Sequence, residues 1–212
     1  MSAYYPVFLD LAGQRCVVLG GNEAAAHKAR GLVDAGADVT AIAADPCAAL
    51  EELPVRLVRR QYQRGDLAGA HLAIDTIGIP EAREEASAEG VLLNVMDQPA
   101  QCDFIAPAVV KRGDLQLAIS TAGESPFLAG AVRARLEADY GEEWAEMTRL
   151  LGSIRRRLRR RGVPLETQKR VYRDLLASNV LDLLREGAVA AARRQTSAVV
   201  RQTLATCRPL SR

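Results

Sequence analysis

The chain has 212 residues, of which 49% are hydrophobic and 25% charged, and its formal net charge is +2 at pH 7. This composition is typical of a globular protein with room for one full α/β domain and a smaller partner. A charge so close to neutral, with only 4% aromatic residues, argues against a nucleic-acid partner.

Four scattered cysteines, Cys16, Cys47, Cys102 and Cys207, have no CxxC spacing, which argues against a zinc site or a disulfide framework. Residues 1–11 lack the features of a signal peptide, and no stretch approaches the ~18 apolar residues of a membrane span. We therefore expect a cytoplasmic protein with reduced cysteines and no membrane partner. His27 and His71 stand without other soft ligands, so a structural role is favoured for them over metal ligation.

The first half of the chain alternates short apolar runs with a helical pattern. Residues 16–19 predict a buried parallel strand that ends at a Gly-Gly pair. Residues 23–35 predict a helix that stops at a glycine, and residues 38–43 predict a second strand. This succession predicts a right-handed βαβ unit. A further helix is predicted at 80–89, and further strands at 55–58, 71–74 and 91–95.

After Pro107 the residue pattern changes from alternating strands and helices to a mainly helical one. Residues 115–119 predict another strand, and a loop follows at 120–126. Apolar residues then recur at helical spacing with arginines between them, which predicts helices at 127–140, 142–161, 164–178 and 179–206. We interpret this half as a dimerisation or lid element. Its arginine run at 155–161 is typical of a solvated helix face, and an anion-binding surface is the alternative.

The turn after the first strand stands where a G-x-G-x-x-(G/A) dinucleotide fingerprint belongs. Gly20 permits the tight turn, Ala25 permits close helix–strand packing, and the helix N-terminus offers free N–H groups to a pyrophosphate. Asn22 replaces the middle glycine, so we expect it to hold a strained turn and to crowd the phosphates. The alternative is a scaffold that has lost the cofactor. The residues assigned here to the cofactor are Gly20, Gly21, Asn22, Glu23 and Ala24.

The second strand ends at Ala43 and Ala44, where an acidic residue is expected in a dinucleotide-binding fold. Asp45 follows and can reach a ribose hydroxyl; the alternative is that it caps the helix after Pro46. Ala44 and Asp45 complete the predicted cofactor site.

A second polar cluster follows the fifth strand, at the edge of the sheet where open α/β sheets bind ligands. Asp97 is a candidate general base there, and Asn94 is its candidate orienter or hydrogen-bond donor. The alternative is a structural aspartate in a turn before Pro99.

The sequence resembles the precorrin-2 dehydrogenase family, which makes sirohydrochlorin and also forms the N-terminal half of siroheme synthase. The resemblance extends from Tyr5 to about Arg135 and is carried by the segments 5–11, 20–21, 27–30, 94–97, 102–107, 112–121 and 123–126. It implies an α/β fold with a Rossmann-type NAD-binding domain at 1–112, a dimerisation region at 113–145 and a helical domain at 146–212. It also implies a homodimer.

The resemblance implies that Asp97 is the family's single catalytic aspartate. That residue serves the oxidation of precorrin-2 and, where it occurs, the insertion of ferrous iron. Thr121 matches a hydroxyl residue of the loop that faces the tetrapyrrole, and Asn94 and Ser125 are assigned with it to substrate binding. For Ser125 the alternative is a cap on the helix that starts near Pro126. The sequence departs from the family pattern at Asn22 and at residues 75–79, both on the cofactor side.

We therefore predict an NAD-dependent precorrin-2 dehydrogenase, with sirohydrochlorin ferrochelatase (lyase) activity as an optional addition. The two departures favour an alternative that lacks NAD, either a chelatase or a non-catalytic tetrapyrrole-binding protein. A regulatory nucleotide sensor is a third hypothesis, and the Asp97 block argues against it. Because the substrate carries many carboxylates, arginines such as Arg112 and Arg133 are expected to line the cleft.

Overall fold

The computed structural model describes residues 4–207, and the chain divides into two compact units. The first unit comprises residues 1–106 and 122–124, and the second comprises residues 107–121 and 125–212. The outer ends of the predicted ranges, residues 1–3 and 208–212, lie outside the described part.

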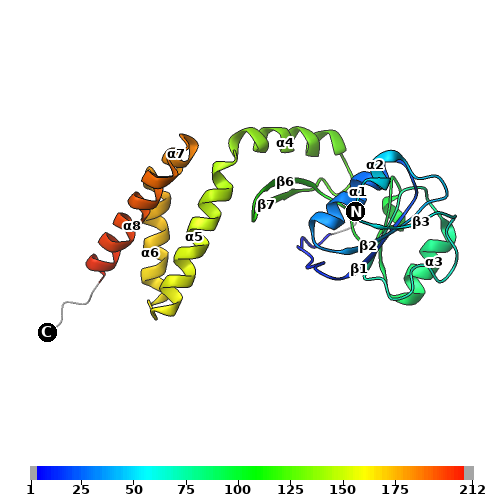
Figure 1. The fold of residues 1–212 in the computed structure, drawn as a ribbon, viewed down its shortest axis with the longest axis horizontal. Coiled ribbons are helices and arrows are strands. Elements are labelled where there is room, and N and C mark those ends of the chain that lie inside the picture. The colour runs from blue at the N-terminus through cyan, green and yellow to red at the C-terminus, as the bar shows by residue number, and fades with distance from the viewer. Residues whose placement is uncertain (1–3, 208–212) are drawn as a thin grey trace. The chain divides into compact units, whose positions relative to one another are not determined.

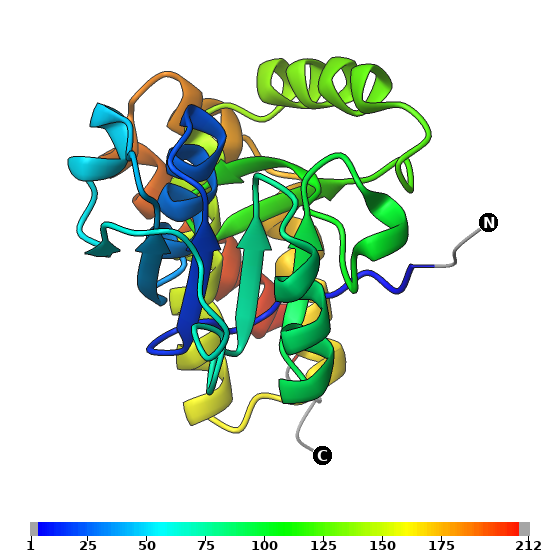
Figure 2. The same cartoon turned by 90° about the vertical axis from the view of Figure 1, so that its right-hand side faces the viewer.

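The first unit is built on a five-stranded parallel sheet with the order β3-β2-β1-β4-β5 (Figure 1). Figure 2 shows β1 and β4 side by side. The connection from β3 back across to β4 makes the β1/β4 boundary the topological switch point, where ligands bind in this fold class. The predicted Rossmann-type α/β class is confirmed. The strands are Arg15–Leu19 (β1), Asp38–Ile42 (β2), Arg56–Val58 (β3), Leu72–Asp75 (β4) and Leu92–Val95 (β5).

Apolar side chains cover both faces of this sheet. Cys16 and Val18 join one cluster with the helix α1 (Glu23–Asp34), and Val17 and Leu19 join another with α3 (Pro80–Glu89). These four side chains of β1 are fully buried, as expected for a parallel strand between two helical layers. Burial, with a smaller contribution from Asp38, raises the pKa of the Cys16 thiol to about 11, so this thiol is unreactive at neutral pH.

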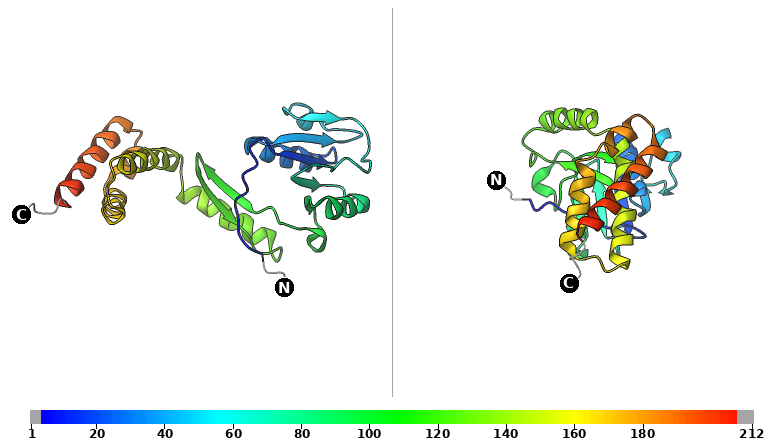
Figure 3. Two further views of the ribbon diagram at one scale, coloured as in Figure 1. Left: turned by 90° about the horizontal axis from the view of Figure 1, so that it is seen from below. Right: turned by 90° about the vertical axis from the view of Figure 1, so that its left-hand side faces the viewer.

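The second unit begins with an antiparallel hairpin of β6 (Ala108–Arg112) and β7 (Leu115–Ile119), in which Val110 lies opposite Leu117. The helix α4 (Pro126–Asp139) contacts both strands, as the left panel of Figure 3 shows. Strand β6 was not predicted. Its side chains contribute a single fully buried residue, Val110, so its apolar pattern is weak.

The chain continues as four helices, whose buried side chains form two apolar clusters. The helices are α5 (Glu143–Arg160), α6 (Leu165–Leu176), α7 (Val180–Arg185) and α8 (Val189–Thr206). The prediction of one helix over 179–206 is wrong, because Gly187 adopts φ +72° and separates α7 from α8. No helix within residues 4–207 combines the length and apolarity that crossing a membrane requires.

Candidate functional site

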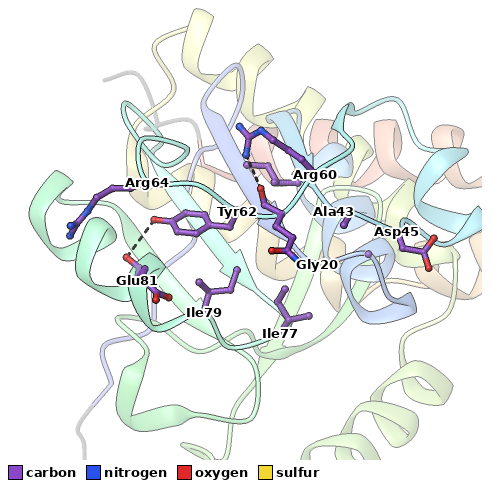
Figure 4. A pocket seen from close by; sticks show the side chains of 13 residues that line it. Gly20, Ala43, Asp45, Arg60, Tyr62, Arg64, Ile77, Ile79 and Glu81 are labelled. Carbon is purple, nitrogen blue, oxygen red and sulfur yellow. Dashed lines mark hydrogen bonds between the residues drawn. The ribbon is translucent and has the colours of Figure 1, made fainter.

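A cavity of about 640 Å³ opens at the carboxyl ends of β1, β2 and β4 in the first unit (Figure 4). Of the residues predicted for the cofactor, Gly20, Gly21, Ala44 and Asp45 line this cavity, whereas Asn22, Glu23 and Ala24, at the start of α1, do not. The other residues that line it are Ile42, Ala43, Arg60, Gln61, Tyr62, Arg64, Ile77, Ile79 and Glu81.

The glycine pair is required by close packing of the turn. Gly20 has φ +114°, and a Cβ there would overlap the hydroxyl of Thr76. A Cβ on Gly21 would overlap the carbonyl oxygen of Asp45, and the N–H of Cys47 donates to the Gly21 carbonyl at 2.7 Å. The turn after β1 therefore packs against the loop after β2 and brings Asp45 beside the fingerprint.

Asn22 is the N-cap of α1. Its backbone is extended, at φ −81° and ψ 174°, so the expectation of a strained turn is wrong. Its side-chain oxygen accepts from the N–H of Ala25 at 2.9 Å, and this bond directs the amide along the first turn of the helix. Capping leaves the N–H groups of Glu23 and Ala24, among the residues described, without an acceptor in the protein. The helix start therefore keeps free donors for an anion.

Asp45 is exposed and lines the cavity. The short helix α2 (Ala48–Glu51) has Cys47 as its N-cap, so the alternative that Asp45 caps this helix is wrong. Its carboxylate remains a candidate partner for a ribose hydroxyl.

A second wall of the cavity, from Arg60 to Arg64, was missed by sequence reasoning. Glu85 of α3 holds this loop: its carboxylate accepts from the N–H groups of Gly65 at 3.0 Å and Leu67 at 2.8 Å, and from the hydroxyl of Tyr62. Glu85 is only 4% exposed. A glutamate that shares a helix face with two buried alanines, Ala82 and Ala86, was the signal for this role.

Both arginines of this wall have acidic partners, Asp66 in the same loop for Arg60 and Glu84 of α3 for Arg64. The Nη1 and Nη2 atoms of Arg60 donate to Asp66, at 2.7 and 2.6 Å, and this pairing lowers the pKa of the Asp66 carboxyl. Burial, followed by the hydrogen bond to Glu85, raises the pKa of Tyr62, so its phenol stays protonated. Figure 4 shows the Tyr62 ring reaching toward Glu81, whose backbone oxygen lies 3.4 Å from the phenol oxygen.

The departure at residues 75–79 builds a third wall. Asp75 is fully buried, and its carboxylate accepts from the N–H groups of Ile77 at 3.0 Å, Gly78 at 2.9 Å and Ile79 at 2.5 Å. These bonds fix the turn that leads into α3 and place Ile77 and Ile79 in the cavity lining. The altered segment thus gives the cavity an apolar wall and does not block it.

Asp97 lies in the turn after β5, the strand beside β4. It is exposed, has φ +59°, and makes no hydrogen bond within residues 4–207. Asn94, which is 8% exposed, donates to the carbonyl of Phe104 at 2.9 Å, and the thiol of Cys102 accepts from the N–H of Val95 at 3.2 Å. Asn94 and Cys102 therefore fold the loop, and Asp97 keeps a free carboxylate at its tip.

The remaining predicted residues lie in the second unit. Ser125 caps α4 by accepting from the N–H of Leu128 at 3.2 Å, which confirms its capping alternative. Thr121 donates to the Ser125 carbonyl at 3.0 Å. Arg112 donates to the carbonyls of Tyr140 at 2.8 Å and Glu137 at 3.2 Å. Its guanidinium therefore holds the end of α4, and the expectation that Arg112 lines the substrate cleft stays a prediction.

Known proteins and protein families match most of the chain. Residues 7–108 match a family model described as putative NAD(P)-binding, and residues 112–139 match one described as sirohaem biosynthesis protein central. The siroheme synthase of Chromobacterium violaceum is 31% identical over 200 residues, which cover 91% of this chain and 43% of that protein. The siroheme synthase of Methylococcus capsulatus is 37% identical over 164 residues, which cover 74% of this chain and 35% of that protein. The chain belongs to the precorrin-2 dehydrogenase family of siroheme biosynthesis.

Membership of the precorrin-2 dehydrogenase family confirms the resemblance and the expected NAD(P)-type cofactor. The solved structure of SirC, a precorrin-2 dehydrogenase, matches with a TM-score of 0.72 at 24% identity and covers 94% of this chain and all of that one, which shows a shared fold. The chain spans less than half the length of the siroheme synthases quoted above. The cavity itself fits a dinucleotide, because the glycine turn, the exposed Asp45 carboxylate and apolar walls line it, and the free N–H groups at the start of α1 directly follow that turn in the chain.

Proposed function

We propose that this protein oxidises precorrin-2 to sirohydrochlorin with NAD⁺. The observation that carries the proposal is the free Asp97 carboxylate, exposed at the tip of a loop after β5. This strand lies beside β4, which leads into the cavity-lining residues Ile77 and Ile79. A carboxylate with no partner of its own is available to a substrate. Its loop is fixed by Asn94 and Cys102, so it is positioned without being neutralised.

We assign the dinucleotide to the cavity at the switch point. The Gly20 turn and the start of α1 would hold the pyrophosphate, and Asp45 would accept from a ribose hydroxyl. An acidic residue at this position favours NAD over NADP. Arg60 also favours NAD over NADP, because its guanidinium is already held by Asp66 and is not free for a 2′-phosphate.

The chemistry of dehydrogenation divides between cofactor and protein. Bound NAD⁺ supplies the hydride acceptor. Asp97 would take the proton that leaves the macrocycle as the new double bond forms, so one hydride and one proton are removed for each oxidation. Thr121 is proposed on the substrate side, while Asn94 and Ser125 would contribute by fixing their own loop and helix.

We propose that the protein acts as a homodimer in a reducing, cytoplasmic compartment. Apolar side chains on α4 support the dimer: Phe127 is 91% exposed, Leu128 55% and Val132 37%. An isologous contact between two copies would bury them. The four free thiols support the compartment. The division into ranges 1–112, 113–145 and 146–212 remains part of this proposal.

The test is to titrate the purified protein with NAD⁺ by calorimetry and then follow NADH absorbance with precorrin-2 under anaerobic conditions. We expect saturable binding and NADH formation in proportion to product. If NAD⁺ does not bind at millimolar concentration while ferrous iron is inserted into sirohydrochlorin, the NAD-independent chelatase is the correct function. If neither reaction proceeds but the tetrapyrrole binds, the non-catalytic alternative holds.

A further inference from the structure

A groove between α5 and α8 in the second unit has no part in the proposed dehydrogenation. Its volume is about 400 Å³, and arginines reach it from both helices: Arg149 and Arg157 from α5, and Arg193 from α8. A neighbouring hollow of about 700 Å³ shares Arg193 and adds Arg194 and Arg201. The right panel of Figure 3 shows α5, α6 and α8 of this unit in one view.

Most of these guanidinium groups lack an acidic partner. Arg149 pairs with Glu146 at 2.8 Å, the only carboxylate in the lining of the groove. The side chains of Arg157, Arg193, Arg194 and Arg201 form no ion pair or hydrogen bond within residues 4–207. Uncompensated like charges around one groove repel one another, and an anion between them would remove that repulsion. Guanidinium groups match carboxylate and phosphate oxygens in a bidentate geometry.

The second observation is an unused buried hydroxyl. Thr196 lines the groove and is 3% exposed, yet its hydroxyl has no hydrogen-bond partner among the described residues. Its neighbours in the lining are committed: Ser153 donates to the Leu150 carbonyl at 2.7 Å, and Ser197 to the Arg193 carbonyl at 3.0 Å. A buried, unpaired donor is unfavourable, so it indicates a missing acceptor at this position.

We propose that the α5/α8 groove binds a small anion that carries two or more carboxylate or phosphate groups. Arg157 and Arg193 clamp it from opposite helices, and the Thr196 hydroxyl donates to it. The groove is small and contains no aromatic side chain for stacking bases, which favours a compact anion over a nucleic acid. The site is formed by residues of the second unit alone and is independent of the dehydrogenase assignment.

The test uses the full chain with inorganic pyrophosphate and citrate as probes, in calorimetry at low and moderate salt and without NAD⁺ or tetrapyrrole. The variant Arg157→Gln/Arg193→Gln is compared with Arg160→Gln/Arg173→Gln, which removes equal charge from exposed arginines outside the groove. We expect the first pair to weaken binding at least about tenfold and the second less than about twofold. Tighter binding of pyrophosphate identifies a phosphate ligand, and tighter binding of citrate a carboxylate ligand.

Thr196→Val provides a second readout that does not depend on charge. It removes the unpaired hydroxyl while keeping the shape, so the apo variant should melt about 2–4 °C higher than the wild type, while its anion-induced rise in Tm should shrink. Absence of binding by both probes at millimolar concentration would overturn the proposal. Equal losses in the two arginine pairs, or preferential binding of an oligonucleotide over both probes, would also overturn it.

Discussion

The carboxylate of Glu85, on α3, accepts a hydrogen bond from the N–H of Leu67 at 2.8 Å, and so joins the helix to a loop 18 residues earlier in the chain. The same carboxylate also accepts from Gly65 and Tyr62, so it joins three residues of this loop to α3. The loop is therefore positioned by a buried carboxylate that does not line the cavity.

Glu85→Gln should loosen this loop. An amide offers one acceptor where the carboxylate offers two, so we expect a loss of about 1–3 kcal/mol in unfolding free energy and weaker NAD⁺ binding. Glu84→Gln is the matched control, because Glu84 is exposed and makes only a surface ion pair with Arg64 at 3.3 Å. Urea denaturation and calorimetry measure the two effects. Indistinguishable results for Glu85→Gln and Glu84→Gln would refute the anchoring role.

Asn22→Ala should destabilise the protein by about 1 kcal/mol, because the side-chain hydrogen bond to the N–H of Ala25 is lost. Asn22→Gly loses the same bond but should cost only a few tenths of a kcal/mol, because glycine suits the N-cap position. Since the backbone at Asn22 is unstrained, glycine should not improve NAD⁺ affinity. Chemical denaturation and NAD⁺ titration test this. A fivefold gain in affinity with Asn22→Gly would instead show that the asparagine crowds the pyrophosphate.

Asp97→Asn should lower kcat for precorrin-2 oxidation by about 10²–10⁴-fold, because an amide cannot accept the proton. Asparagine tolerates the positive φ of this position, so folding and tetrapyrrole binding should stay near wild type. Asp97→Gly should be equally inactive, with no loss of stability from the backbone. Anaerobic turnover measures kcat, and a melting curve for each variant measures its stability. Activity of either variant within a fewfold of wild type would remove Asp97 from the mechanism.

Stability should fall as the solution is acidified, and Asp66 should contribute. Its folded-state pKa is lowered, chiefly by the hydrogen bond from Arg60 and then by the N–H of Gln63. Its contribution is therefore fully present above its unfolded pKa of about 3.9 and is lost as the pH falls through the lower folded value. Asp66→Asn should be less stable than wild type at pH 7, with a gap that narrows toward pH 3. Asp114→Asn, at an exposed site, should show no such pattern; a constant gap for Asp66→Asn would contradict the linkage.

Phe127→Glu should convert the proposed homodimer to a monomer, because it places a charge on the most exposed apolar side chain of α4. Leu165→Glu on α6, where the leucine is 64% exposed, should leave the dimer intact. Sedimentation velocity at micromolar concentration reports both. A wild-type monomer, or dissociation by both variants alike, would exclude α4 as the interface.

Local sequence was sufficient where a segment carried its own signal. The apolar run after Arg15, the glycine turn at Gly20 and the alanine-rich helix behind it determined the first βαβ unit, because parallel strands covered on both faces must be continuously apolar. Proline at its first turn determined the start of α3 at Pro80. Ser125 before Pro126 similarly determined the cap of α4.

Tertiary structure decided what depends on partners distant in sequence. Whether Asn22 strains or caps its turn depended on where its side chain could find a donor, and that donor was the N–H of Ala25. The helix position of Glu85 was a signal for a buried role, but the loop from Arg60 to Arg64 that it holds could not be identified, because the two lie on different elements and meet only in the folded chain. Asp97 could be identified as a carboxylate at a sheet edge from its sequence position, but its freedom from any internal partner is a property of the folded loop alone.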